Sequence, residues 1–315
     1  VGVGPGNWVL HIYPYYGKYL PSVFRQWRQP HNDYLATASE KGIPGLIIYL
    51  LIFILILVRA FKVLKQSEDS KSWWTVFWML NGLIGFLVIS FFSFPAQRIN
   101  QVIFVCLIVA VILSKHEKSI PDPKKINQSF VKWIFPVPLV FLIFSIWFGV
   151  ISIRSEYYVS KAQMAKEQQN WREVEKNIEK GYHPLAPIEP KFSMPPIMYK
   201  GMVAFHKDKD YKKALGYFKE AYSKHPSNVP VINNIGSTYG EMGQYDSSLV
   251  WFQKSLDIFP HYEHALLNLA KVNYSTGNYE QAYKLVLSCD PESENRNVQA
   301  LKGRIEDLLD PIPKD

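Results

Sequence analysis

A histidine stands among basic residues just before the first long apolar stretch of the chain. His31 follows Pro30, and Arg25 and Arg28 lie a few residues upstream. Proline favours the first position of a helix, so we expect a short helix over 30–41 with His31 in its first turn. The free N–H groups there attract anions and favour the neutral imidazole. A neutral base beside arginines suits activation of a hydroxyl next to a bound pyrophosphate. The competing interpretation is that these residues only decorate a membrane edge.

Two residues mark the junction between this short helix and the apolar stretch that follows it. Gly42 suits the C-terminal cap of a helix, and Pro44 suits the first turn of the next helix. We therefore expect the chain to bend at Gly42, from a helix at the membrane interface into a helix that crosses the membrane.

Four uncharged stretches have the composition of membrane spans. They cover residues 42–58, 72–97, 99–114 and 133–153. A helix needs about 20 residues to cross the hydrocarbon core, and flanking arginines and lysines extend the two shorter stretches by snorkelling. The sequence therefore predicts four membrane-spanning helices.

The basic residues between these stretches set the orientation. Lysines and arginines gather in 59–71 and 115–132, whereas the loop SFPAQRIN between the second and third stretches holds only Arg98. By the positive-inside rule the two basic loops are cytoplasmic. His31, the SFPAQRIN loop and everything after Ile153 then lie on the outer side, which is the periplasm in a bacterium with two membranes.

The second half of the chain repeats every 34 residues. Tyr211, Tyr245 and Tyr279 have this spacing, and small and aromatic residues recur at matching positions. The period is typical of tetratricopeptide repeats. We expect units beginning near 195, 229 and 263, a degenerate unit near 155 and a final helix over 296–309. The proline-rich segment 183–196 interrupts the array, because it cannot form a regular helix.

The sequence thus predicts an all-α fold in three parts. Residues 1–42 form an outer loop with the interfacial helix, 43–153 a transmembrane domain with four spans, and 155–315 a tetratricopeptide-repeat α-solenoid. Such an array offers a concave surface to peptides or proteins, or serves as a spacer or oligomerisation element. The sequence leaves these alternatives open.

Other features exclude several classes of function. The net charge of +8 lies mostly in the short loops rather than in one nucleic-acid-binding patch. The opening GVGPGN lacks the spacing of a dinucleotide-binding motif and is better explained as a tight turn. His261 and His264 share a turn, but two ligands fall short of the usual three or four of a zinc site. We expect no metal and no cofactor. Because the chain starts at Val1 and shows no signal peptide, we interpret it as the C-terminal part of a longer protein.

The residues around His31 resemble the signature of a known family. His31 and Asn32, followed after nine residues by Gly42 and after two more by Gly45, resemble the motif of bacterial O-antigen ligases, O-antigen polymerases and protein O-oligosaccharyltransferases. VGVGPGNW at the start and FFSFPAQR at 91–98 resemble two further stretches of that family. The resemblance covers about 1–115, and a C-terminal tetratricopeptide array is a familiar attachment to such proteins.

The resemblance implies a metal-independent membrane glycosyltransferase. The donor would be a glycan linked to polyprenyl pyrophosphate, and the acceptor a hydroxyl of a lipid A core, of another glycan or of a protein. His31 would be the general base and Asn32 would orient it. Arg25 and Arg28 would hold the donor pyrophosphate, a role they match by charge and neighbourhood. The family's remaining arginines and donor groove lie on earlier spans, so we expect this chain to be inactive alone.

A second hypothesis belongs to a different class. The protein could be a non-enzymatic membrane scaffold that binds envelope proteins through its repeats. This accounts for residues 155–315 equally well. It does not account for the common spacing of His31, Asn32, Gly42 and Gly45.

Overall fold

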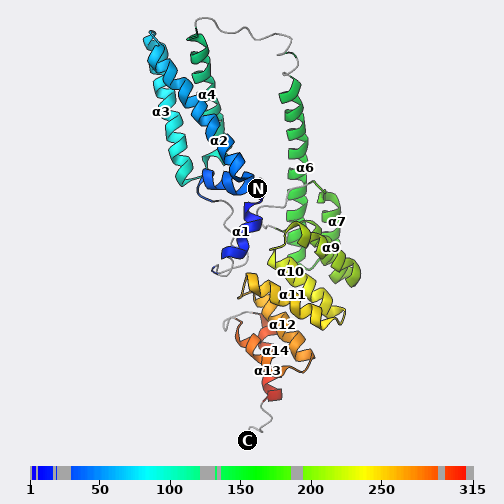
Figure 1. Ribbon diagram of the computed structural model, residues 1–315. Coiled ribbons are helices and arrows are strands. Elements are labelled where there is room, and N and C mark those ends of the chain that lie inside the picture. The colour runs from blue at the N-terminus through cyan, green and yellow to red at the C-terminus, as the bar shows by residue number, and fades with distance from the viewer. Residues whose placement is uncertain are drawn as a thin grey trace. The chain divides into compact units, whose positions relative to one another are not determined.

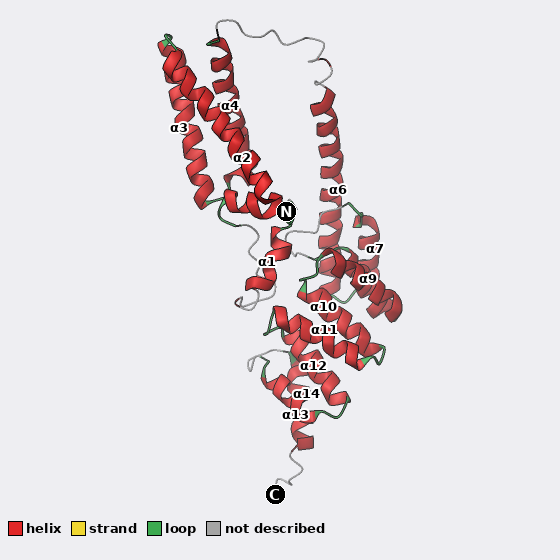
Figure 2. Ribbon diagram, viewed as in Figure 1, coloured by secondary structure: helices red, strands yellow, loops and turns green. Residues whose placement is uncertain are grey.

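The computed structural model is built from helices (Figures 1 and 2). It describes residues 2–4, 6–16, 19, 30–120, 132, 136–185, 194–289 and 295–309, and every regular element in these ranges is a helix. The elements are α1 (Trp8–Tyr16), α2 (Asp33–Gln66), α3 (Ser70–Phe92), η2 (Pro95–Gln97), α4 (Ile99–Lys118), α6 (Pro136–Glu167), α7 (Trp171–Gly181), α8 (Ile197–Val203), η3 (Ala204–Asp208), α9 (Tyr211–Lys224), α10 (Val229–Glu241), α11 (Tyr245–Ile258), α12 (Glu263–Ser275), α13 (Tyr279–Leu287) and α14 (Arg296–Leu309).

The chain divides into two compact units. The first comprises residues 1–9 and 27–140, and the second comprises 10–26 and 141–315. In the first unit, α2, α3 and α4 pack side by side (Figure 1). Their shared core consists of Ile56, Ala60, Val63, Val76, Leu80, Leu83 and Ile112.

Within the described ranges, four helices are long and apolar enough to cross a membrane. They are α2, α3, α4 and α6, with 34, 23, 20 and 32 residues. Each overlaps one of the predicted apolar stretches, and α2 and α4 contain theirs completely. The second stretch stops being an α-helix earlier than expected, at Phe92, because Pro95 cannot continue the helix and opens the short η2 instead. Length and composition thus agree with the predicted spans.

The helix that carries the candidate site begins later than we predicted. Asn32 is its N-cap, since the Asn32 side chain accepts a hydrogen bond from the backbone N–H of Leu35 at 2.8 Å. The expectation that His31 lies in the first turn is therefore wrong, and His31 precedes the cap. The physical reason is that asparagine satisfies an otherwise unpaired N–H of the first turn, which a proline start over 30–41 leaves open.

The predicted bend at Gly42 is present. Gly42 has φ 74° and ψ 178°, so α2 consists of two helical segments, 33–41 and 43–66. Left-handed backbone costs residues other than glycine about 1–2 kcal/mol. Pro44 stands in the first turn of the second segment, where its missing N–H removes no hydrogen bond.

The second unit consists of helical pairs joined by one kind of turn. The pairs are the C-terminal part of α6 with α7, α8 and η3 with α9, α10 with α11, and α12 with α13. One residue in each connecting turn has positive φ: Gln169, Lys209, Gly243 and Gly277. The second helix of each pair begins with an aromatic residue two positions later. The helix pair expected near 155 therefore has the same turn as the three regular ones, and α14 occupies 296–309 as predicted.

Small residues in the first helix let aromatic residues of the second approach closely. A Cβ atom added to Gly201 would lie 2.5 Å from the ring of Phe218, and one added to Gly236 would lie 2.7 Å from the ring of Phe252. Both rings are buried. The two helices of a pair can therefore pack this closely only because a small residue faces the aromatic ring.

One helical pair contains a single inserted residue. Gly201 precedes Lys209 by eight residues, whereas Gly236 precedes Gly243 by seven. The extra residue is absorbed by η3, a π-helical turn over Ala204–Asp208. Turns of this kind arise from one-residue insertions and recur at functional sites. The insertion changes the direction of the side chains that follow Val203.

Candidate functional site

The start of α2 is tied to the segment that follows α3. The Asn32 side-chain amide donates to the backbone carbonyl of Phe91 at 2.9 Å, and the backbone N–H of Ala96 donates to the Asp33 carboxylate at 2.9 Å. Asp33 is buried. Both polar atoms of the Asn32 side chain thus bind backbone groups. The role of Asn32 in orienting His31 stays a prediction. Asn32 positions the chain on either side of it.

These ties place His31 and a basic residue from the loop between α3 and α4 against the same aromatic ring. The rings of His31 and Phe94 meet edge to face with centroids 5.1 Å apart. The Arg98 guanidinium lies over the same Phe94 ring, 5.0 Å from its centroid. His31 and Arg98 are both exposed. A side chain that can accept a proton and a permanent cation therefore flank one aromatic ring.

The two motif glycines, Gly42 and Gly45, are each required by a different feature of the backbone. Gly42 supplies the left-handed conformation of the bend. The bend also folds the side chain of Lys41 back, so that a Cβ atom on Gly45 would lie 2.4 Å from the Lys41 Cβ atom. The spacing from Asn32 to Gly42 and Gly45 is thus explained by the backbone, because Asn32 caps a short helix and the two glycines permit the bend at its end.

The glycine-rich opening docks on the same short helix. The N–H groups of Val3 and Gly4 donate to the carbonyls of Ser39 and Glu40 at 2.9 and 2.8 Å. These carbonyls belong to the last turn before the bend, where helical partners are missing. A Cβ atom on Gly2 would lie 2.3 Å from the Glu40 oxygen, so only glycine fits. Gly4 and Gly6 have φ 95° and 76°, and the predicted tight turn is confirmed.

The structure places some of the predicted site residues and adds others. Arg25 and Arg28 lie outside the described residues. Asp33 and Phe94 were missed, and the sequence analysis gave Arg98 only a topological role. The sequence feature that could have identified Arg98 as a site residue is that it carries the single charge in the outer loop SFPAQRIN. In the described parts of the chain, no three His, Cys, Asp or Glu side chains gather as metal ligands would.

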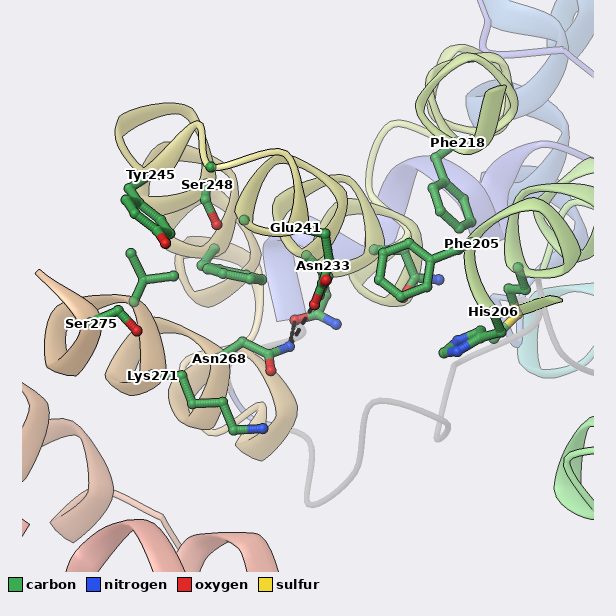
Figure 3. Close-up of a pocket in the computed structure, with 17 residues that line it drawn as sticks. Phe205, His206, Phe218, Asn233, Glu241, Tyr245, Ser248, Asn268, Lys271 and Ser275 are labelled. Atoms are coloured by element: carbon green, nitrogen blue, oxygen red, sulfur yellow. Dashed lines mark hydrogen bonds between the residues drawn. The ribbon is translucent and has the colours of Figure 1, made fainter. Parts of the chain in front are cut away.

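The second unit holds a separate candidate site, a groove along its first helices. The groove has a volume of about 670 Å³ and is lined mainly by η3, α10, α11 and α12, together with Met202 of α8 and Phe218 of α9 (Figure 3). Across it, the Asn268 amide donates to the Asn233 side-chain oxygen at 3.2 Å and to the Ser237 hydroxyl at 3.3 Å. Amide side chains that face a groove can pair with the main chain of an extended peptide.

The inserted π-turn contributes two aromatic side chains to the groove. Phe205 and His206 both belong to η3 and line one end of it (Figure 3). His206 stacks on Trp171, with ring centroids 4.2 Å apart and planes 9° apart. Burial lowers the pKa of His206, and so does the nearby Lys209 charge. This end therefore presents neutral aromatic surface, whereas Glu241 and Lys271 supply charge further along.

Comparison with known proteins bears on the second unit. A tetratricopeptide-repeat family model matches residues 240–305. Among solved structures, the tetratricopeptide-repeat domain of Sgt2 from Aspergillus fumigatus is 20% identical, covering 38% of this chain and 85% of that one, with TM-score 0.32. A tetratricopeptide-repeat protein from Parabacteroides merdae is 17% identical, covering 49% and 60%, with TM-score 0.38. PilF from Pseudomonas aeruginosa is 14% identical, covering 77% and 86%, with TM-score 0.40.

The family match confirms the predicted tetratricopeptide repeats for 240–305. The pairs further upstream share the same left-handed turn and aromatic start, as described above. Repeats of this kind suggest a surface that binds proteins. The resemblance of 1–115 to the ligase and polymerase family stays a prediction.

Proposed function

We propose that this protein is a membrane glycan transferase of the O-antigen ligase type. One observation carries the proposal: His31 and Arg98, far apart in sequence, flank the Phe94 ring at the end of the bundle formed by α2, α3 and α4. The motif spacing that resembles the family is explained by the cap and bend that hold His31 there. A scaffold needs neither a histidine nor an arginine at this position.

The proposed reaction follows from these two groups. The His31 imidazole takes the proton of the acceptor hydroxyl, and the hydroxyl oxygen forms a bond to the anomeric carbon of the glycan. The bond between that carbon and the lipid pyrophosphate breaks, and the pyrophosphate leaves with the electron pair. In this proposal the Arg98 guanidinium, which lies against the same Phe94 ring as His31, stabilises this charge, since guanidinium pairs well with phosphate oxygens. The scheme uses no metal and no cofactor.

The proposed location is the inner membrane of a bacterium. In this assignment α2, α3, α4 and α6 span the bilayer, and the basic segments 59–71 and 115–132 face the cytoplasm. His31, Arg98 and the repeat array then lie on the periplasmic side, where lipid-linked glycans are delivered. The acceptor is a lipid A core in a ligase, a second glycan in a polymerase, or a protein hydroxyl in an oligosaccharyltransferase.

The test is substitution in the chromosomal gene. His31→Ala and Arg98→Ala are introduced one at a time, and surface glycan is followed on gels. We expect both to abolish or strongly reduce the transferred glycan. His11→Ala and Arg59→Ala, which change an exposed histidine of α1 and a cation at the other end of α2, are the controls and should leave it unchanged. Normal surface glycan with His31→Ala would remove the catalytic role.

We also propose that the repeat array binds a protein partner. The groove with its Asn233, Ser237 and Asn268 side chains supports this, as does the family match. The test places a photo-crosslinking amino acid at Ser237 in the groove or at Val250, which is exposed on α11 outside it. Adducts from Ser237 and none from Val250 are the expected result. Equal adducts from both positions would contradict a groove-specific partner.

A further inference from the structure

One helix carries both an apolar segment and the first core of the repeat array. Residues 136–153 of α6 hold no charged side chain. A few residues further along the same helix, Val159, Ala162 and Ala165 are buried in a cluster with residues of α7 and α8. Ser155 is already buried. The array therefore begins where the apolar segment ends, with no flexible linker between them.

The second helix of this first pair runs back along α6. A Cβ atom on Gly181 would lie 2.5 Å from the Tyr158 Cβ atom, so the last turn of α7 touches α6 closely. The Arg154 side chain donates to the carbonyl of Lys180 at 3.1 Å and occupies one of the unpaired carbonyls at that helix end. The end of α7 thus lies level with Arg154, the first charge after the apolar segment.

The chain beyond α7 continues past that level. The ring of His183 lies 6.4 Å from the ring of Trp147, centroid to centroid. Trp147 precedes Arg154 by seven residues, which is about 10 Å along an α-helix. The backbone N–H of Leu185 donates to the His183 ring nitrogen at 3.2 Å and closes a turn. This turn, residues 183–185, therefore lies beside the apolar segment of α6, whereas Tyr182 just before it packs against the repeat core.

The side chains at this level match a membrane interface. Trp147 and Tyr157 are exposed aromatic residues, and Arg154 and Lys180 are exposed cations. Tryptophan and tyrosine concentrate at headgroup level, where arginine and lysine reach toward the phosphates. The Leu185 side chain is 57% exposed although it is apolar. Exposure of this apolar side chain to water is unfavourable, whereas its burial at the boundary between headgroups and acyl chains is favourable.

We propose that the turn 183–185, flanked by Arg154 and Lys180, is a lipid-contacting collar that seats the first helical pair on the membrane surface. The occupant of this surface is the bilayer interface, because the turn lies beside the uncharged segment of α6 and carries the exposed apolar side chain of Leu185. The inference rests on the proposed span in α6. Its consequence is that the repeat array stands at a fixed height above the bilayer instead of swinging on a tether.

The test measures the membrane depth of three positions. A nitroxide label is attached to Leu185→Cys, Phe144→Cys or Met164→Cys, one at a time. The background is Cys106→Ser with Cys289→Ala, which removes one exposed and one buried thiol. All three labelled side chains are exposed, so the fold should tolerate them. The whole chain is placed in nanodiscs of phosphatidylcholine and phosphatidylglycerol, and label collisions with oxygen and with a water-soluble nickel chelate are compared.

The results at the three positions test the span in α6 and the collar separately. We expect oxygen collisions to dominate at Phe144 and at Leu185, and nickel collisions to dominate at Met164, an exposed residue further along α6, where the helix packs into the repeat array. Nickel dominance at Leu185 with oxygen dominance at Phe144 would overturn the collar while the span stands. Nickel dominance at Phe144 would overturn the span and the collar together.

Discussion

At the scale of single residues, the backbone requirement of each position explains the motif around His31. Asn32 caps the helix with its side-chain oxygen and donates from its amide nitrogen to the Phe91 carbonyl. Gly42 is needed for its left-handed conformation, and Gly45 for the close approach of Lys41. None of these residues touches a reacting group in the proposed scheme. They fix where His31 stands, and only His31 and Arg98 carry chemistry.

The bend predicts a loss of stability for Gly42→Ala. Alanine in this left-handed conformation costs about 1–2 kcal/mol, so the purified protein in nanodiscs should unfold at a lower temperature. Gly85→Ala is the matched control, because Gly85 lies within α3 with open space around its Cβ position. We expect no loss for the control. Equal melting temperatures for the two variants would show that the bend is not under this constraint.

A buried histidine predicts acid sensitivity of the second unit. Burial lowers the pKa of His225 to about 4, whereas a histidine in an unfolded chain has a pKa of about 6.5. The unfolded chain therefore takes up a proton at higher pH than the folded chain. The stability contribution is complete above pH 6.5 and is lost as the pH falls toward 4, by about 3 kcal/mol.

The measurement is unfolding of wild type and His225→Leu between pH 7 and pH 4. Carboxylates titrate in both proteins, so the difference between the two isolates the histidine. We expect this difference to change by about 3 kcal/mol in favour of the variant over that range. A constant difference would mean that His225 is protonated equally in the folded and unfolded chains.

At the scale of elements, close contact between small and aromatic residues holds each helical pair together. Gly236→Ala would place a methyl group 2.7 Å from the buried Phe252 ring, and overpacking of this kind costs about 1–3 kcal/mol. Hydrogen exchange of the whole chain should show faster exchange in α10 and α11. Gly216→Ala in α9, where nothing lies within 4 Å, should leave exchange in α9 unchanged or slower. Faster exchange in α9 of that control would point to a general intolerance of substitution.

Helix identity was predictable from the sequence because its causes are local. Apolar length, the 34-residue period and the glycine and proline at the bend all act within a few turns of chain. The start of α2 was missed by three residues because proline at N1 and asparagine at the cap are both local signals, and the cap prevailed. The π-turn was also readable, since Gly201 stands one residue out of step with Gly236.

At the scale of the whole molecule, the candidate site depends on contacts between distant segments. The placement of His31 and Arg98 against one ring depends on the hydrogen bonds from Asn32 to Phe91 and from Ala96 to Asp33. No periodicity or spacing within one segment encodes these pairings. The sequence could therefore predict a histidine on the outer side of a membrane, but it could not predict which arginine shares an aromatic ring with it.

The two proposed activities are compatible within one chain. The proposed transfer site lies in the first unit and the groove in the second, and neither shares a side chain with the other. The central claim is narrower than this, namely that His31 removes the proton of the acceptor hydroxyl.

The turnover of the lipid-linked donor in cells tests that claim most directly. Labelled polyprenyl-pyrophosphate glycan is chased and extracted from cells with His31→Ala or with the control His11→Ala. A general base contributes about 10²–10⁴-fold to the rate, so turnover with His31→Ala should fall at least about a hundredfold and the donor should accumulate. Turnover equal to that of the control would contradict the account.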